Sequence, residues 1–198
     1  MASTAARSTV RRSAAALLAA SLVALGATAC NTGDSSVSTE AKKPASSAPA
    51  ASGGAKQGAP APAKVGDTIA LKGFEKNGTA DVTVVKIVDN AEGEDEFSKP
   101  ADGKRFVAVQ FRIKATGKAY SDAPSNSAKL LDNQGQSYDT SLYDTKAGQG
   151  FSGSVNIAPG ESGLGFLTFE VPKDAVLDKV QFTLDSGMAD QTGQWKLA

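Results

Sequence analysis

The sequence predicts an all-β fold, an antiparallel β-sandwich, preceded by a signal peptide and a disordered linker. Three observations lead to this prediction. Short runs of alternating apolar and polar residues recur through residues 65–198, and a period of two is typical of half-buried strands. Turn-forming residues separate these runs, and no apolar pattern with the period of a helix is sustained. The segment is long enough to bury a core without disulfide bonds.

The clearest predicted strand is Phe106–Ile113. Four large apolar residues share one of its faces, namely Val107, Val109, Phe111 and Ile113. Residues 163–171 and 179–184 alternate in the same way. Asp81–Val88 is almost continuously β-branched, as expected for a strand near the centre of a sheet. Weaker candidates are Thr68–Leu71, Ala128–Leu131, Gln136–Thr140, Ser152–Ile157 and Gln194–Leu197.

Turn residues lie where these strands should end. Asn77-Gly78 is a pair typical of tight turns, and Pro159-Gly160 precedes the run that begins near residue 163. Pro172 ends that run, because proline has no N–H to give to a strand ladder.

Residues 1–29 have the layout of a signal peptide. Arg7, Arg11 and Arg12 form a positive region, and the apolar stretch Ala14–Ala24 follows it. Small residues then lead to Cys30, the one cysteine of the chain. The arginine pair leaves open whether export follows the Sec or the twin-arginine route.

The sequence Ala27-Thr28-Ala29-Cys30 resembles the lipobox of bacterial lipoproteins. The resemblance implies that the thiol of Cys30 receives a diacylglyceryl group and that cleavage before Cys30 makes it the new N-terminus. Two acyl chains on one residue give stable membrane anchoring. Lipoboxes prefer Leu where Ala27 stands, and Ala27-x-Ala29 also fits an ordinary secretory cleavage site at the same bond. Free secretion and an uncleaved anchor therefore remain alternatives.

Composition divides the rest of the chain in two. Residues 31–64 are mostly Ala, Ser, Pro, Gly and Lys without aromatic residues, so we expect a disordered linker over residues 30–64. Residues 65–198 hold every aromatic residue, 14 basic and 19 acidic residues, giving a net charge of −5 (14 − 19). An acidic domain without a basic run gives no indication of nucleic-acid binding.

Few residues offer catalytic or metal chemistry. The chain has no histidine, the commonest general base and zinc ligand, and no cofactor motif is present. An acidic stretch could bind Ca²⁺ weakly through Asp89, Glu92, Glu94, Asp95 and Glu96. A solvated charged loop is the alternative interpretation. Six aromatic residues lie at predicted strand ends or in loops, where they either form a ligand platform or cap the core: Phe74, Tyr120, Tyr138, Tyr143, Phe151 and Trp195.

Six segments taken in order carry a resemblance to a known family: Gly66–Ile69, Asp81–Ile87, Gly103–Ile113, Leu130–Tyr138, Ala158–Pro172 and Lys179–Leu184. Residues 65–198 resemble a telokin-like, immunoglobulin-like domain of unknown function found in bacterial lipoproteins and related to a secreted mycobacterial antigen. The resemblance implies an immunoglobulin-like sandwich and transfers no catalytic residue. The acidic insertion Asp89–Glu96 and the polar segment Tyr120–Asn126 depart from the family pattern.

These observations predict a membrane-anchored extracytoplasmic lipoprotein that is not an enzyme. We expect its immunoglobulin-like domain to bind an unknown partner, either an envelope protein or wall polymer or a small exported ligand, through loops or an edge strand. The alternatives are a passive structural role as a surface antigen and a weak calcium-dependent module built on residues 89–96.

Overall fold

The computed structural model describes residues 36–42, 62–151 and 153–197. The predicted signal peptide, residues 1–29, and the predicted lipidation site, Cys30, lie outside these ranges. Within them, no helix is long and apolar enough to cross a membrane.

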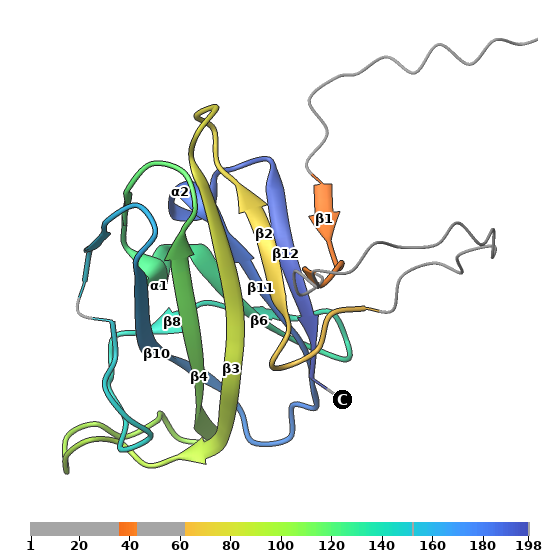
Figure 1. The fold of residues 1–198 in the computed structure, drawn as a ribbon. Helices are drawn as coiled ribbons and strands as arrows, with labels where there is room; N and C mark the ends of the chain where they lie inside the picture. The colour runs from red at the N-terminus through yellow and green to blue at the C-terminus, as the bar shows by residue number, and fades with distance from the viewer. Residues whose placement is uncertain (1–35, 43–61, 152, 198) are drawn as a thin grey trace, which may run out of the picture. The chain divides into compact units, whose positions relative to one another are not determined.

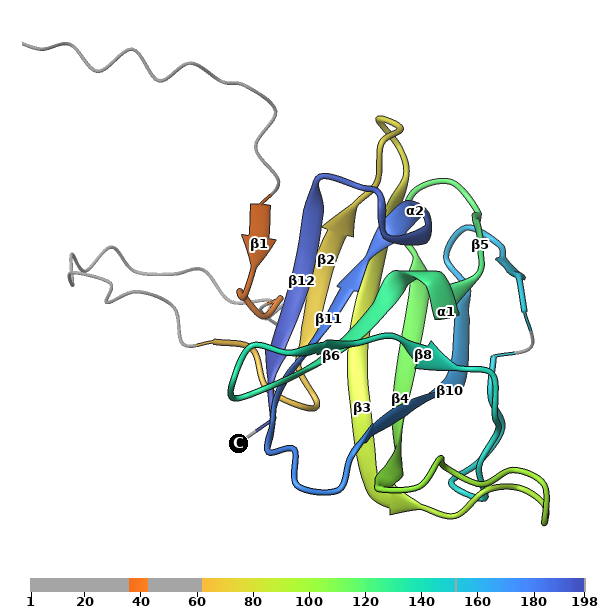
Figure 2. The ribbon, with the colours of Figure 1, turned by 180° about the vertical axis from the view of Figure 1, so that it is seen from behind.

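Two five-stranded sheets form the fold (Figures 1 and 2). Sheet A has the order β1-β12-β11-β6-β7. Its strands are β1 (Ser36–Ser38), β12 (Gln191–Lys196), β11 (Leu177–Thr183), β6 (Ala128–Asp132) and β7 (Ser137–Tyr138). Sheet B has the order β2-β3-β4-β10-β8. Its strands are β2 (Thr68–Lys72), β3 (Thr79–Ala91), β4 (Lys104–Ala115), β10 (Ser162–Pro172) and β8 (Thr140–Ser141).

Three smaller elements lie outside the two sheets. A short ribbon pairs β5 (Tyr120–Asp122) with β9 (Val155–Ile157). Two four-residue helical turns, α1 (Pro124–Ser127) and α2 (Leu184–Gly187), lie side by side (Figure 1). Neighbouring strands are antiparallel except for β1, which runs parallel to β12.

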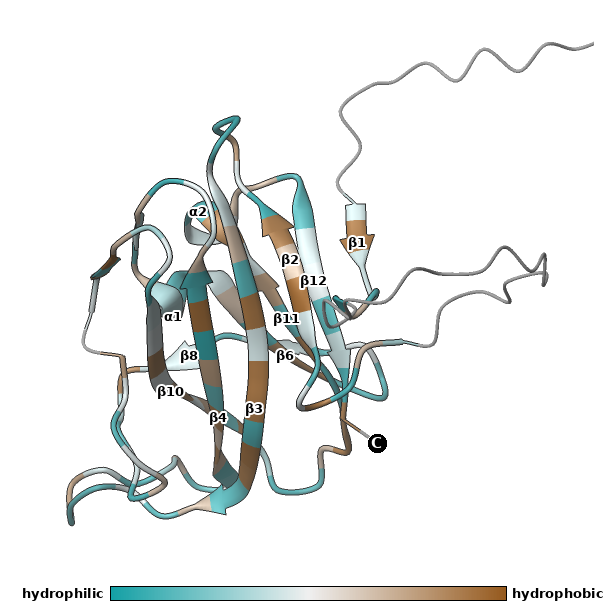
Figure 3. Ribbon diagram, in the orientation of Figure 1, coloured by the Kyte–Doolittle hydropathy of each residue, from teal (hydrophilic) through white to brown (hydrophobic). Residues whose placement is uncertain are grey.

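Alternating side chains build the core between the sheets, as the sequence predicts. In β4 the four predicted inward residues Val107, Val109, Phe111 and Ile113 are fully buried, whereas Arg112 is exposed. The same alternation appears as brown and teal bands along β3 and β4 in Figure 3. The ring of Phe111 meets that of Phe182 from β11 at 5.3 Å between centroids. Packing of side chains from both sheets thus confirms the predicted β-sandwich.

The outer face of sheet B is partly covered, which the strand pattern does not predict. Phe106 and Phe166 point away from the main core and are nevertheless buried. The ring of Phe106 contacts Tyr143 at 5.7 Å between centroids, and Gly150 bridges to Phe166. Residues 143–150 therefore lie against this face and remove Phe106 and Phe166 from water.

Part of the expected linker belongs to the folded unit. Ser36–Ser38 forms β1 on the edge of sheet A, and Ala63 is fully buried. The main chain of Ala63 accepts a hydrogen bond from Lys196 N at 2.8 Å. Amino-acid composition could not predict that these linker residues are ordered. They are held by backbone hydrogen bonds to a sheet edge, and such bonds do not depend on the type of side chain.

Candidate functional site

A small pocket lies at the end of the sandwich where β3 begins and β4 ends. Its volume is about 70 Å³. Three stretches of chain line it, residues 78–80, 118–122 and 184–185. The lining includes the phenol of Tyr120, the carboxylates of Asp122 and Asp185, and Lys118 at the rim. We call this feature the Tyr120 pocket.

Tyr120 carries a buried hydroxyl group without a hydrogen-bond partner. Its side chain is 8% exposed, and its ring packs in the main core. Among the described residues, only this hydroxyl and that of Thr145 are buried side-chain polar atoms left without a partner. Ser127 lies close enough to interact weakly with this hydroxyl, but without hydrogen-bond geometry, and its own hydroxyl lies 3.4 Å from Asp122 Oδ2. Because buried polar groups are almost always paired, a water molecule or a ligand atom in the pocket would complete the hydrogen bonding of this hydroxyl.

The phenol of Tyr120 is neutral. Burial raises the pKa of Tyr120 well above its ordinary value, and the Asp122 carboxylate adds to the rise.

Asp122 fixes the shape of the pocket floor. Its Oδ1 accepts hydrogen bonds from Ala123 N at 2.7 Å and from the Ser186 hydroxyl. Its Oδ2 accepts one from Ser186 N at 2.7 Å. Asp122 thus ties the β5 ribbon to the turn that follows β11, and its acceptor sites are used within the protein.

In the turn after β11, two residues have backbone angles in the left-handed region of φ/ψ space. Asp185 has φ 54° and ψ 52°, and Ser186 has φ 54° and ψ 37°. Each such conformation in a non-glycine residue costs roughly 1–2 kcal/mol. Strained backbone of this kind clusters at functional sites. Here the strain directs the Asp185 carboxylate toward the pocket and the Ser186 N–H toward Asp122.

Asp185 keeps one carboxylate oxygen available. Its Oδ2 accepts a hydrogen bond from Phe74 N at 2.6 Å. The approach requires Gly73, since a Cβ there would lie 2.4 Å from Asp185 Oδ2. No hydrogen bond from a described residue reaches Asp185 Oδ1. Together with the Tyr120 hydroxyl, this oxygen offers a ligand two acceptors in one small space.

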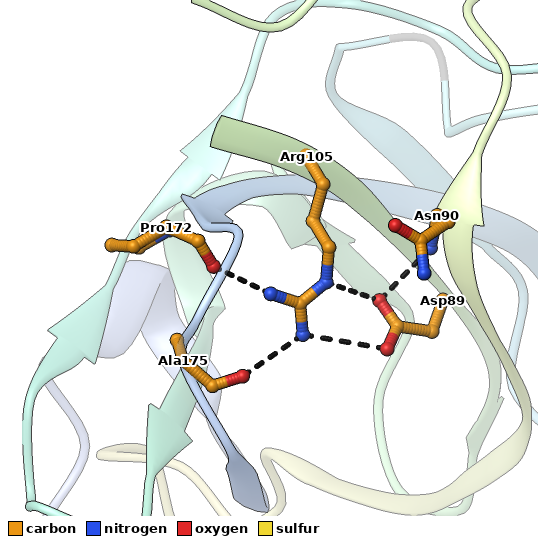
Figure 4. A network of polar contacts seen from close by, with 5 residues as sticks. All are labelled: Asp89, Asn90, Arg105, Pro172 and Ala175. Atoms are coloured by element: carbon orange, nitrogen blue, oxygen red, sulfur yellow. Dashed lines mark hydrogen bonds and ion pairs between the residues drawn. The ribbon is translucent and has the colours of Figure 1, made fainter. Parts of the chain in front are cut away.

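Arg105 occupies the opposite end of the sandwich, where β3 ends and β4 begins (Figure 4). Its guanidinium donates to Asp89 Oδ1 at 2.6 Å, to the Pro172 carbonyl, and to the Ala175 carbonyl at 3.0 Å. The side chain borders an open groove of about 620 Å³. The N–H groups of Arg105 donate to protein acceptors, and its positive charge is paired with Asp89. Arg105 therefore stabilises this end of the fold and has few donors left for a ligand.

The five acids proposed as calcium ligands do not meet at one point. Asp89 pairs with Arg105, Glu92 pairs with Lys146 at 3.2 Å, and Asp95 accepts hydrogen bonds from Phe97 N and Ser98 N. Glu94 is exposed, and its N–H donates to the Asp144 carbonyl at 3.1 Å; Glu96 is also exposed. In the part of the chain that the structure describes, no three acidic or cysteine side chains form a group that could hold a metal ion.

The six aromatic residues divide between the two roles considered for them. Trp195 and Tyr120 are buried, and Trp195 Nε1 donates to the Asp67 carbonyl at 2.9 Å. Tyr138 and Phe151 are half-buried and pack against the core. Phe74 is 59% exposed and Tyr143 is 43% exposed. The aromatic residues therefore form no single platform.

A family model described as "Domain of unknown function (DUF4352)" matches residues 73–192, more than half of the chain. The chain belongs to the DUF4352 family. The matched range includes the three stretches that line the Tyr120 pocket and both residues of the Arg105–Asp89 pair. Comparison with curated proteins finds no match.

Several solved structures resemble this DUF4352 domain. The secreted protein MPT63 of Mycobacterium tuberculosis is 17% identical, with a TM-score of 0.52, over 67% of this chain and 94% of that chain. A candidate lipoprotein of Bacillus subtilis, ycdA, is 17% identical, with a TM-score of 0.50. That match covers 68% of this chain and 38% of the ycdA chain. At these identities the likeness shows the fold alone, and it agrees with the predicted β-sandwich family of unknown function.

The segment Tyr120–Asn126, expected to depart from the family pattern, supplies Tyr120 and Asp122 to the pocket. The sequence predicted no pocket there, and Asp185 and Ser186 were not among the candidate residues. The signal was Asp185-Ser186-Gly187 directly after a strand, since Asp and Gly favour left-handed turns.

Proposed function

We propose that this protein is a lipid-anchored extracytoplasmic binding module that receives its ligand at the Tyr120 pocket. The observation that carries the proposal is the buried, unpartnered Tyr120 hydroxyl beside a pocket with strained backbone. Strain and an orphaned polar group both reduce stability, and such features persist where function requires them.

The pocket favours a small hydrogen-bond donor. Asp185 Oδ1 and the Tyr120 hydroxyl can both accept, and the lining holds two carboxylates against one lysine, Lys118, whose ammonium pairs with Glu75 at 2.7 Å. A volume of about 70 Å³ admits a single small group, such as a terminal ammonium, rather than a whole large ligand. We infer that a larger partner inserts such a group while resting on the surrounding loops. The proposed activity is binding without catalysis.

The anchor is supported by the sequence. The one cysteine of the chain stands at the position that a lipobox requires. Secretion of MPT63 and the description of ycdA as a candidate lipoprotein accord with an extracytoplasmic location. Cys30 would carry the lipid, and the domain would face outward.

Mapping by NMR tests the pocket directly. Methylammonium is the probe, because it carries only the group that the pocket is proposed to bind. We expect amide shifts to concentrate at residues 78–80, 118–122 and 184–186 and to diminish in Asp185→Asn, which keeps the left-handed turn. Lys129→Gln, at an exposed position of β6, is the control for nonspecific binding. Shifts spread evenly over the surface, or unaffected by Asp185→Asn, would contradict the site.

Thermal melting tests the calcium-dependent alternative, and crosslinking in cells tests the passive one. The calcium-dependent module predicts a higher midpoint with millimolar Ca²⁺, whereas the present proposal predicts no change. The passive role predicts that no envelope component is enriched when the domain is crosslinked in cells.

A further inference from the structure

The outer edge of sheet A is covered by the chain's own N-terminal segment. Ser36, Val37 and Ser38 pair in parallel with Gln191, Thr192 and Gly193 of β12. Ser36 N donates to the Asp190 carbonyl at 2.6 Å. In Figures 1 and 2, β1 stands beside β12. Ala63 and Lys64 pair with the same edge at Lys196. Without the N-terminal segment, the Gln191–Gly193 part of β12 would present an unpaired edge, the kind of surface that recruits another strand.

The same segment continues to sheet B. Lys42 N donates to the Thr68 carbonyl of β2 at 2.6 Å, and the Lys42 ammonium pairs with Asp81 on β3. Ala63 N donates to the Thr39 carbonyl at 2.7 Å. The N-terminal segment therefore also contacts the residues that precede β2. Residues 36–42 thus join the edges of both sheets, where β12 and β2 meet.

The contact depends on backbone pairing more than on packing. Val37 is the one large apolar residue of the segment, and it is 56% exposed. The Lys42 side chain is half exposed, and Asp81 is mostly covered. A strand held by a few hydrogen bonds and one ion pair, without a buried anchor, can detach while the sandwich stays folded.

We propose that the β12 edge is a strand-acceptor site and that Ser36–Lys42 of the tether is its occupant, a reversible latch. The ligand class is an extended peptide that runs parallel to β12 and carries a lysine six residues after its first paired residue. Pairing through an added strand is an established way of binding peptides.

The latch would set the reach of the domain from its anchor, a consequence that rests on the proposed lipid at Cys30. A chain extends at most ~3.5 Å per residue. Ser36 is the sixth residue after Cys30, so latched Ser36 can lie at most about 20 Å from the anchored residue. With the latch released, the 32 residues from Cys30 to Pro62 allow at most about 110 Å. Release would therefore lengthen the reach about fivefold and expose the β12 edge.

Hydrogen exchange in the mature chain tests the latch without any lipid or pocket ligand. We expect the amides of Lys42 and Ala63 to exchange at least about tenfold more slowly than in an unstructured peptide. Ser36→Pro removes the donor to Asp190 and should abolish most of that protection. Val37→Pro is the matched control, because alternate N–H groups of a paired strand point away from the ladder, and it should retain protection.

A second variant acts through the side chain. Lys42→Glu places two acids together at Asp81 and should also release the segment, whereas Lys72→Glu, at an exposed position of β2, should not. A ¹⁵N-labelled peptide covering residues 35–43 should then bind the Ser36→Pro chain more tightly than the wild-type chain.

Three results would overturn the proposal. Lys42 and Ala63 amides that exchange at the rate of an unstructured peptide would show that no latch forms. Equal effects of Ser36→Pro and Val37→Pro would show that the β12 ladder is not involved. A peptide that binds neither chain would show that the edge is no acceptor. None of these readouts depends on Cys30 or the Tyr120 pocket, so failure of the latch and failure of the proposed function are distinguishable.

Discussion

Replacing Tyr120 by phenylalanine should make the domain more stable. The change removes the hydroxyl that has no hydrogen-bond partner and leaves the buried ring in place. An unsatisfied buried polar group costs about 1–3 kcal/mol. Allowing for partial relaxation around Ser127, we expect Tyr120→Phe to stabilise the fold by about 1 kcal/mol. For a domain of this size the corresponding rise in Tm is about 4 °C.

Tyr138→Phe is the matched control. The hydroxyl of Tyr138 donates to Asp132 Oδ2 at 2.7 Å, so its removal loses a hydrogen bond to a charged acceptor. The same chemical change should therefore destabilise the domain. Equilibrium unfolding in urea, followed by the fluorescence of the fully buried Trp195, measures both variants. Since Trp195 is the one tryptophan of the chain, the signal is unambiguous.

The result that would refute this reasoning is a loss of stability in Tyr120→Phe comparable to that in Tyr138→Phe. It would mean that the Tyr120 hydroxyl is satisfied in the free protein, and the main observation behind the proposed pocket would be gone. If the reasoning holds, Tyr120→Phe gains stability while losing affinity for the methylammonium probe.

Three further predictions concern other parts of the molecule. Arg105→Met leaves two carbonyls and Asp89 without their donor and should destabilise the fold by roughly 2 kcal/mol in urea unfolding; an unchanged midpoint would contradict the structural role of Arg105. The bond from Tyr138 and backbone N–H groups lower the pKa of Asp132 below 3.8. Asp132 therefore stabilises the folded state above pH 3.8, and this contribution disappears as the pH falls through the lowered pKa. Asp132→Asn should flatten the acid limb of a stability–pH curve, and an unaltered limb would exclude this cause. Cys30→Ser should move the protein from the membrane fraction to the medium, and continued membrane association would exclude the lipid anchor.

The sequence predicted the sandwich well because its strands have strong side-chain periodicity. The buried face of β4 was predicted residue by residue, and β3 lies inside its sheet as its β-branched run indicates. The strand near residues 136–140 was less well defined. It divides into β7 and β8, which belong to different sheets, because the chain crosses from one sheet to the other within a few residues.

The remaining features depend on contacts that periodicity does not encode. The latch residues Ser36–Ser38 have no apolar pattern, and their order comes from backbone bonds to β12. The left-handed turn at Asp185–Ser186 depends on Asp122, more than sixty residues earlier in the chain. The acids between Asp89 and Glu96 formed a cluster in sequence, yet each has its own partner or solvent in space. Local pattern predicts which face a side chain occupies, whereas these features are set by distant neighbours.

Site-specific photocrosslinking in living cells tests the central claim most directly. A photoreactive amino acid at exposed Ser121, on the rim of the Tyr120 pocket, should capture a defined envelope component. The same group at exposed Ser137 on β7 should not capture it, and Asp185→Asn should abolish capture from position 121. Equal capture from both positions, or capture that Asp185→Asn leaves unchanged, would contradict a binding module built on this pocket.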